Sequence, residues 1–153
     1  MINHIDHINI VVRDLEKNVE FYRDVLGFRV TMEALLEGEW IDAVVGLKGV
    51  RARCVYLQPE NGPRLELLQY ESPVGEEVPR QGAANTQGYR HVAFLVDDIE
   101  VEYERLCARG VKFLGPPVTV PLQSVKTLTG RKRLCYFHGP EDVLLEICDY
   151  RKE

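Results

Sequence analysis

An internal repeat is the feature that most constrains the fold of this chain. Residues 55–70 read VYLQPENGPRLELLQY and residues 135–150 read CYFHGPEDVLLEICDY, and the two segments align without a gap at an offset of 80 residues. Each segment has two apolar runs separated by a turn rich in Pro, Gly, Asn or Asp, which is the pattern of a β-hairpin. We therefore expect two copies of one supersecondary unit.

A second pair of matching segments opens the two halves. HINIVVRDLEKNVEFYRDVLGFRV begins at His7, and HVAFLVDDIEVEYERLCARGVKFL begins at His91. In both, an apolar strand leads to an aspartate seven residues after the histidine, Asp14 or Asp98, which we predict to cap a helix. Apolar residues at helical spacing follow each cap, and a glycine ends each predicted helix.

Each half therefore reads β-α-β-β-β. We predict a first module at 1–70, a linker at 71–89 rich in Pro, Gly and polar residues, and a second module at 90–153. The glycine-punctuated segment 38–50 holds the single tryptophan, Trp40, and is predicted to be a loop with a short helical turn. This loop would either lie over a cleft or pack Trp40 into the protein.

Composition narrows the possible partners. The net charge of −5 argues against nucleic acid, because phosphate binding relies on clustered Lys and Arg. The basic cluster at 131–133 (RKR) is interpreted as a solvated turn, with contact to an anionic substrate group as the alternative. No apolar run approaches the ~20 residues that span a bilayer, so we expect no membrane segment and a cytoplasmic protein.

The cysteines lack any C-x-x-C spacing, and each lies in an apolar stretch. We interpret them as buried, reduced thiols rather than as a zinc site or disulfides. They are Cys54, Cys107, Cys135 and Cys148.

Four polar residues recur at equivalent places in the two halves. His7 and His91 begin the first strand, and Glu66 and Glu146 lie inside the apolar last strand. Any one of them alone would be interpreted as a surface or core residue. Together they indicate a site, because a carboxylate on a half-buried strand costs several kcal/mol unless it is paired or bound to a metal. Two imidazoles and two carboxylates suit a divalent Ni, Co, Zn, Mn or Fe ion. The other two histidines are interpreted as surface residues.

These features resemble the vicinal oxygen chelate superfamily, which includes glyoxalase I, methylmalonyl-CoA epimerase, extradiol dioxygenases, and fosfomycin and bleomycin resistance proteins. The resemblance covers nearly the whole chain and rests on DHINIVVRDLEKNVEFYRDVLGF, RHVAFLVDDIEVEYERL, RLELLQY and LLEICDY. It implies an α+β fold in which two tandem βαβββ modules, with one helix each, form a curved mixed sheet and a half-barrel cleft. The cleft would form within one chain or by exchange between two chains, and an exposed sheet edge would favour a homodimer.

The resemblance also implies a function. Metal ligands at His7, Glu66, His91 and Glu146 are similar to the set of glyoxalase I, in which Glu66 and Glu146 would also carry protons for a small α-hydroxycarbonyl or thiohemiacetal substrate. One alternative is a ring-cleaving dioxygenase that uses His7, His91 and Glu146 with Fe(II) or Mn(II) and O2. Another is a non-enzymatic, drug-binding protein.

The resemblance to bacterial glyoxalase I departs at two positions. The Arg and Asn that contact the glutathione arm in that pattern are replaced by Val11 and Tyr70. This departure argues against glutathione as the substrate carrier.

Overall fold

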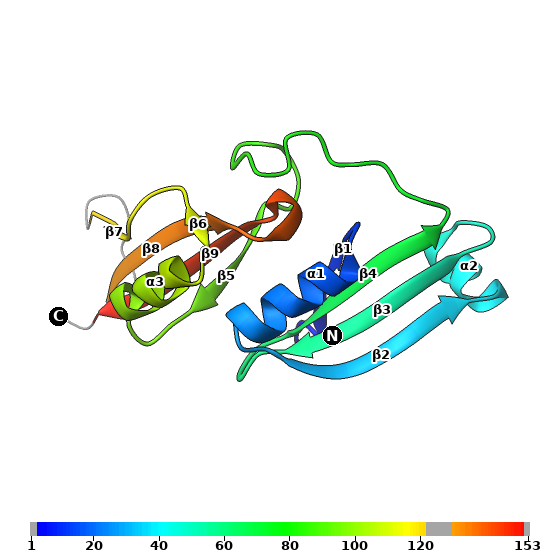
Figure 1. Ribbon diagram of the computed structural model, residues 1–153, viewed down its shortest axis with the longest axis horizontal. Coiled ribbons are helices and arrows are strands. Elements are labelled where there is room, and N and C mark those ends of the chain that lie inside the picture. The colour runs from blue at the N-terminus through cyan, green and yellow to red at the C-terminus, as the bar shows by residue number, and fades with distance from the viewer. Residues whose placement is uncertain (1–2, 122–129, 152–153) are drawn as a thin grey trace. The chain divides into compact units, whose positions relative to one another are not determined.

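The computed structural model describes residues 3–121 and 130–151, and its α+β fold is shown in Figure 1. The chain separates into two compact units, Met1–Glu77 and Val78–Glu153. Each unit holds its own mixed sheet, and the described residues form two α-helices in the first unit and one in the second, where one helix per module was predicted. The parts of the predicted second module at 122–129 and 152–153 lie outside the described residues. The boundaries of the predicted modules and linker stay a prediction.

The first unit contains a four-stranded sheet in the order β1-β4-β3-β2. Strand β1 runs parallel to β4, and the other neighbours are antiparallel. A βαβββ order produces this arrangement when its first and last strands pair: the last three strands form antiparallel neighbours, and the first and last strands run parallel. The elements are β1 (His7–Val11), α1 (Leu15–Glu20), the π-helical turn η1 (Phe21–Val25), β2 (Arg29–Glu37), α2 (Glu39–Val45), β3 (Arg51–Gln58) and β4 (Arg64–Ser72).

The second unit repeats this plan. Its sheet has the order β5-β9-β8-β6, with β7 also paired to β8, and β5 is parallel to β9. The strand expected directly after the helix is divided into the short strands β6 and β7. The elements are β5 (His91–Leu95), α3 (Ile99–Ala108), β6 (Lys112–Phe113), β7 (Val118–Thr119), β8 (Arg131–His138), the 3-10 turn η2 (Pro140–Asp142) and β9 (Leu144–Arg151).

Both predicted helix caps are confirmed. The Asp14 carboxylate accepts the backbone N–H of Lys17 at 3.0 Å. The Asp98 carboxylate accepts the N–H groups of Glu100 and Val101 at 3.0 and 3.3 Å. These bonds satisfy donors that the first turn of a helix leaves without an intrahelical partner. After each helix a glycine takes a positive φ of 80°, as the predicted stops require: Gly27 and Gly110.

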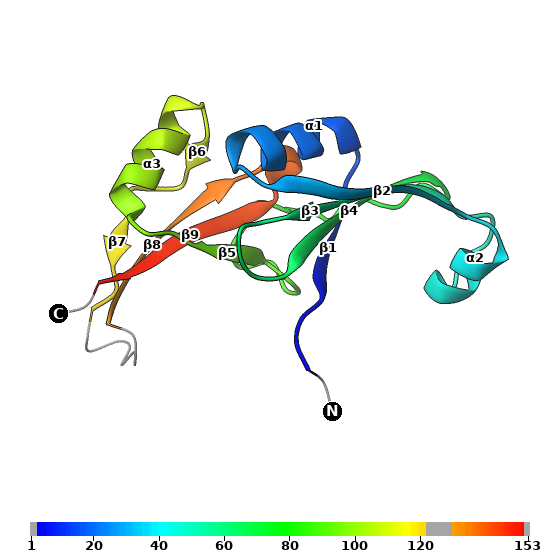
Figure 2. The same cartoon turned by 90° about the horizontal axis from the view of Figure 1, so that it is seen from below.

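A repeated contact joins each helix to its own sheet. The side-chain oxygen of Gln69 on β4 accepts the N–H of Leu15 at 3.2 Å, and the Asp149 carboxylate on β9 accepts the N–H of Ile99 at 3.1 Å. Gln69 and Asp149 are equivalent at the offset of 80 residues. Each last strand therefore turns its odd-numbered residues toward the helix of its own unit. Figure 2 shows α1 and α3 each on one face of the sheet of its unit.

Repeated arginines strengthen the same contact. Arg53 forms an ion pair with Glu16 of α1, and its repeat partner Arg133 forms one with Glu100 of α3. Arg133 also contacts the buried Asp149, with Nε 2.8 Å from Oδ1. The interpretation of 131–133 as a solvated turn is therefore wrong: these residues begin strand β8, and Arg133 is buried.

The segment 38–50 was predicted to be a loop with a short helical turn, and residues Glu39–Val45 within it form helix α2, followed by a loop at 46–50. Trp40 remains 57% exposed, so it does not pack into the core. Ile41 packs instead, because it points inward from the first turn of α2. The small cluster around it consists of Val50, Ala52, Leu36, Val45 and Tyr70.

The remaining sequence predictions are confirmed in part. All four cysteines are free, and three are buried, whereas Cys107 on α3 is exposed. His4 is exposed as predicted, but His138 is half-buried. Its ring lies so close to Gly82 that a Cβ there would be 2.7 Å from His138 Cε1. Within the described residues, no helix has the length and apolar character needed to cross a bilayer.

Candidate metal centre

The predicted ligands of the first unit share the sheet face that α1 does not cover. Gln69 points toward α1, so Glu66, an odd number of residues away on β4, points to the opposite face. In the parallel pair β1–β4, Asn9 lies beside Glu66, and His7 lies two residues before Asn9 on the same face. Strand alternation thus places His7 and Glu66 together, as the sequence predicted.

The side chains of His7 and Glu66 approach each other directly. His7 Nε2 lies 3.5 Å from Glu66 Oε2. On the other side of the ring, His7 Nδ1 lies 2.9 Å from Asp6 Oδ2. We assign the proton to Nδ1 because Asp6 can only accept it, which leaves the lone pair of Nε2 facing Glu66. A carboxylate behind a ligating histidine commonly orients it in this way.

Neutral donors hold the Glu66 carboxylate. The Tyr56 hydroxyl donates to Oε1 at 2.8 Å, and the Asn9 amide donates to Oε2 at 3.0 Å. The Cys54 thiol contacts Oε1 at 3.7 Å. Burial, followed by the bond to Glu66, raises the pKa of Tyr56 to about 12, and burial raises the pKa of Cys54 to about 12. Both groups therefore keep their protons at neutral pH and remain donors.

The second unit contains the equivalent pair. His91 Nε2 lies 3.2 Å from Glu146 Oε2. The Glu146 side chain is only 3% exposed, which makes it a buried carboxylate. The Tyr136 residue, the repeat partner of Tyr56, lies opposite Glu146 in the β8–β9 register, and its ring is 4.9 Å from the His91 ring. Asp149 points toward α3, so His91 and Glu146 again occupy the face without the helix.

A lysine neutralises Glu146. Lys132 Nζ on β8 lies 2.8 Å from Glu146 Oε1, and the Lys132 side chain is 25% exposed. The contact with Glu146 raises the pKa of the Lys132 ammonium. The buried carboxylate thus has an ammonium at one oxygen and an imidazole at the other, an arrangement that offsets much of the cost of its burial.

The two pairs are equivalent in geometry and different in their supporting groups. Asn9, which donates to Glu66, corresponds to Ala93 in the second unit. Lys132, which contacts Glu146, corresponds to Ala52 in the first unit. The structure therefore brings the four predicted ligands together as two pairs, one in each unit, with unequal surroundings.

Several supporting residues were not predicted from the sequence. Tyr56 and Tyr136 could have been found, because they match in the repeat and strand alternation places them beside the glutamates. Asn9 carried a signal as a polar residue on the face of His7. Asp6 and Lys132 carried none that distinguishes them from ordinary surface charges.

The donor set fits a divalent first-row ion. Two ligands bound at right angles with bonds of about 2.1 Å lie roughly 3 Å apart. The nitrogen and oxygen of the two pairs are 3.5 and 3.2 Å apart, close to that separation. Imidazole nitrogens and carboxylate oxygens are also ligands that Mn, Fe, Co, Ni and Zn accept. Glu66 and Glu146 would hold the ion through the oxygens that face His7 and His91.

A separate acidic cluster does not share these properties. Asp98, Glu100 and Asp149 lie close enough to hold a cation. Their carboxylates are already occupied, since they cap α3 and form ion pairs with Arg133 and Arg151. This cluster attaches the helix to the sheet.

Comparisons with known proteins agree with this fold. The model of the Glyoxalase/Bleomycin resistance protein/Dioxygenase superfamily matches residues 4–147. The chain is 30% identical to the protein YwbC of Bacillus subtilis (strain 168), over 95% of this chain and 97% of that protein. It is 28% identical to 2-epi-5-epi-valiolone epimerase of Actinomyces sp, over 94% of this chain and 77% of the epimerase. The crystal structure of a glyoxalase family protein from Bacillus cereus is similar with a TM-score of 0.79 and 27% identity, over 97% of this chain and 95% of that one.

Proposed function

Because the chain belongs to the Glyoxalase/Bleomycin resistance protein/Dioxygenase superfamily, we propose that it is a metal-dependent lyase or isomerase of the glyoxalase I type. Its substrate would be a small α-hydroxycarbonyl compound or thiohemiacetal. The ligands would be the two equivalent pairs, His7 with Glu66 and His91 with Glu146. The observation that carries the proposal is that each unit independently places an imidazole nitrogen 3.2 to 3.5 Å from a carboxylate oxygen.

A divalent ion at these residues would act as a Lewis acid toward two neighbouring oxygens of a substrate. The protein's own residues would then move the proton. One glutamate carboxylate would accept a proton from the carbon next to the carbonyl, and negative charge would develop on the substrate oxygens. The same or the other glutamate returns the proton to the neighbouring carbon, so the reaction is an isomerisation without net oxidation.

The supporting groups suggest how the carboxylates are prepared for this step. Tyr56 and Asn9 hold the two oxygens of Glu66, and Lys132 holds Oε1 of Glu146. Such contacts restrict each carboxylate to one orientation, which favours proton transfer along a fixed direction. Asp6 does the same for the His7 ring.

Two observations bear on the substrate class. A relative that is 28% identical is named 2-epi-5-epi-valiolone epimerase, and an epimerase is a kind of isomerase. Val11 is 56% exposed on β1, and Tyr70 packs against the cluster around Ile41, so neither offers the Arg or Asn contacts expected for glutathione. We therefore propose a substrate carrier other than glutathione.

We also propose a homodimer. In the described sheet of the first unit, β1 and β2 are edge strands, and exposed edges commonly pair in assemblies. Light scattering of the purified protein gives its mass, and a monomer at all concentrations would refute this assembly.

Metal content tests the proposed site directly. Protein purified without chelators should hold a stoichiometric divalent first-row ion, measured by elemental analysis, and His7→Ala or His91→Ala should lower that content. The loaded protein should then be assayed on methylglyoxal with several thiols, glutathione included. Oxygen uptake with catechols, or a wild-type protein that binds no metal, would contradict the proposal.

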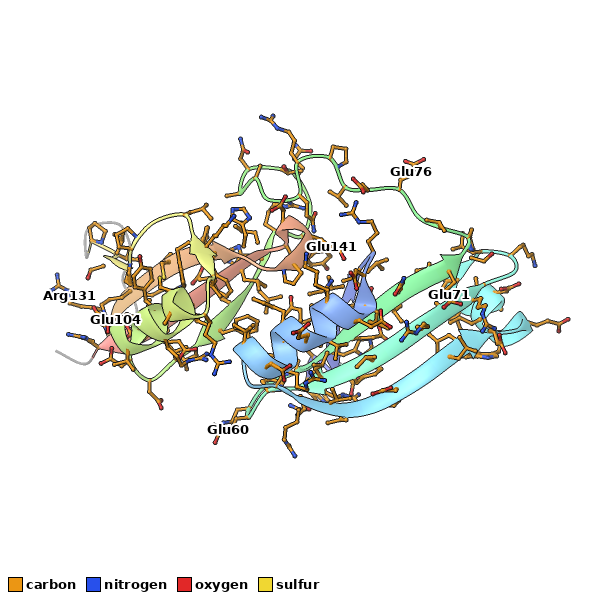
Figure 3. All side chains as sticks on the ribbon, viewed as in Figure 1. Glu60, Glu71, Glu76, Glu104, Arg131 and Glu141 are labelled. Carbon is orange, nitrogen blue, oxygen red and sulfur yellow. The ribbon has the colours of Figure 1, made fainter. Side chains whose placement is uncertain are left out.

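Replacing the buried glutamate tests the proton transfer. We expect Glu146→Gln to keep the fold, seen by circular dichroism, and to lower turnover by roughly 100-fold or more, because an amide cannot accept the proton. Glu104→Gln on the exposed side of α3 is the matched control and should leave turnover unchanged (Figure 3). Full activity in Glu146→Gln would show that this residue is not a required base.

A further inference from the structure

The direct partners of the two carboxylates in the proposed metal-ligand pairs differ by one positive charge, because Arg64 in the first unit pairs with Asp6 rather than with Glu66. Glu66 is held by the neutral donors Tyr56 and Asn9, whereas Glu146 is held by the ammonium group of Lys132. The residue equivalent to Lys132 in the first unit is Ala52, which is buried and carries no charge. The internal repeat therefore does not account for a lysine at position 132.

Neighbouring cations do not replace this charge. Residues 131–133 belong to strand β8, so Lys132 faces Glu146 while the residues on either side face away from it. Arg133 points toward α3, where it pairs with Asp149 and Glu100. Arg131 extends outward at the end of the strand (Figure 3). Lys132 alone of these three basic residues lies on the face of His91.

The positive charge of Lys132 is balanced by the Glu146 carboxylate only as long as Glu146 does not also bind a metal ion. Lys132 already balances the single negative charge of Glu146, so a divalent ion bound at His91 and Glu146 would leave positive charge in excess. The Lys132 side chain is mostly buried, and water screens its charge incompletely. A cation so close to a divalent ion is unfavourable unless a further anion joins them.

We infer that Lys132 makes this site select substrates that carry a carboxylate or phosphate group beside the two oxygens presented to the metal. This inference rests on the proposed function, and it narrows the substrate to anionic α-hydroxycarbonyl compounds. Lys132 Nζ carries three N–H donors, and it lies 2.8 Å from Glu146 Oε1 as an ion pair. The substrate anion would accept a hydrogen bond from this ammonium group.

Three α-hydroxyketones test the inference by binding. Dihydroxyacetone is neutral, hydroxypyruvate carries a carboxylate, and dihydroxyacetone phosphate carries a phosphate. Calorimetry with wild-type protein of measured metal content should show at least one of the two anionic compounds binding about tenfold or more tighter than dihydroxyacetone, as one charge-assisted hydrogen bond would give. The two anionic compounds distinguish a carboxylate from a phosphate substrate.

Three variants identify the residue responsible. Lys132→Gln should bring the anionic and neutral compounds to within about twofold of each other, and Lys132→Arg should retain most of the preference because it keeps the charge. Lys112→Gln on β6 removes an exposed lysine from the same unit and should leave the preference intact.

Each result decides the matter. Equal binding of all three compounds by metal-loaded wild-type protein, or no binding of any, overturns the inference whether or not the variants fold. A preference retained in Lys132→Gln also overturns it. In these cases the proposed function stands if the metal is present and Glu146→Gln loses turnover, whereas a wild-type protein without metal overturns the function and the inference together.

Discussion

At the scale of single residues, Lys132 and Arg133 show how much one step along a strand decides. Lys132 contacts Glu146 on the site face, and Arg133 contacts Asp149 on the helix face. Both cations form an ion pair with a buried carboxylate. Lys132 lies at the proposed metal site, whereas Arg133 helps to attach α3 to the sheet. Adjacent strand residues point to opposite faces, so a cluster that looks uniform in sequence has two roles.

The Arg133–Asp149 pair should be important for stability. The two side chains are 8% and 4% exposed, and Arg133→Met would leave a buried carboxylate without its partner. We expect a loss of about 3 kcal/mol in the free energy of unfolding, measured by urea denaturation. Arg131→Met, which removes the exposed arginine two residues earlier, should change it by less than about 0.5 kcal/mol. Equal effects of the two substitutions would show that burial of the pair does not matter.

The prediction of the four ligand positions from sequence rested on the same alternation. His7 and Glu66 had to share a face once β1 and β4 were neighbours, and the repeat transferred that reasoning to His91 and Glu146. The groups that contact each carboxylate come from neighbouring strands, so their identity depends on which strands pair and in which register. Lys132 was assigned to a solvated turn because the start of strand β8 was not predicted at residue 131.

At the scale of elements, each helix is attached by its first turn. Asp14 and Asp98 cap the helices from the short connection that follows the first strand, and Gln69 and Asp149 reach the first helical N–H from the last strand. The N–H donors at each helix start therefore bind one residue near in sequence and one far away. The caps were predictable from local sequence, whereas the contacts from Gln69 and Asp149 join residues more than 50 positions apart along the chain.

Loss of a cap should have a modest, local effect. Asp98→Ala removes the acceptor for the N–H groups of Glu100 and Val101, and these bonds lower the pKa of Asp98. We expect a lower free energy of unfolding and a lower Tm in thermal denaturation, because the N-cap acceptor is lost. Asp97→Ala, at an exposed position before the cap, is the control and should have little effect. A Tm unchanged in Asp98→Ala would mean that the α3 start is stabilised by Asp149 alone.

At the scale of the whole molecule, buried thiols make stability depend on alkaline pH. Burial raises the pKa of Cys54 and of Cys135 from 9.0 to about 12. Between these values the folded protein keeps protons that the unfolded chain has lost. Stability is therefore unaffected by these thiols below pH 9 and falls as the pH rises from 9 toward 12.

Denaturation at several pH values measures this effect. The free energy of unfolding should fall by about 1.4 kcal/mol per pH unit for each thiol above pH 9, as proton linkage requires. The double variant Cys54→Ala/Cys135→Ala should show a shallower decline over the same window. An identical decline in the variant would assign the alkaline sensitivity to other groups, such as the tyrosines.

The sequence by itself determined the repeat, the α+β order of each half and the helix caps, and it predicted a histidine and a glutamate for each unit. These features follow from periodicity and local hydrogen bonding, which neighbouring residues specify. Only the tertiary structure decided that Tyr56 and Asn9 hold Glu66, that Lys132 rather than Arg133 meets Glu146, and that residues 39–45 form a helix with Trp40 outside. Those outcomes depend on which strands pair and in which register, because one residue of register moves every side chain to the other face.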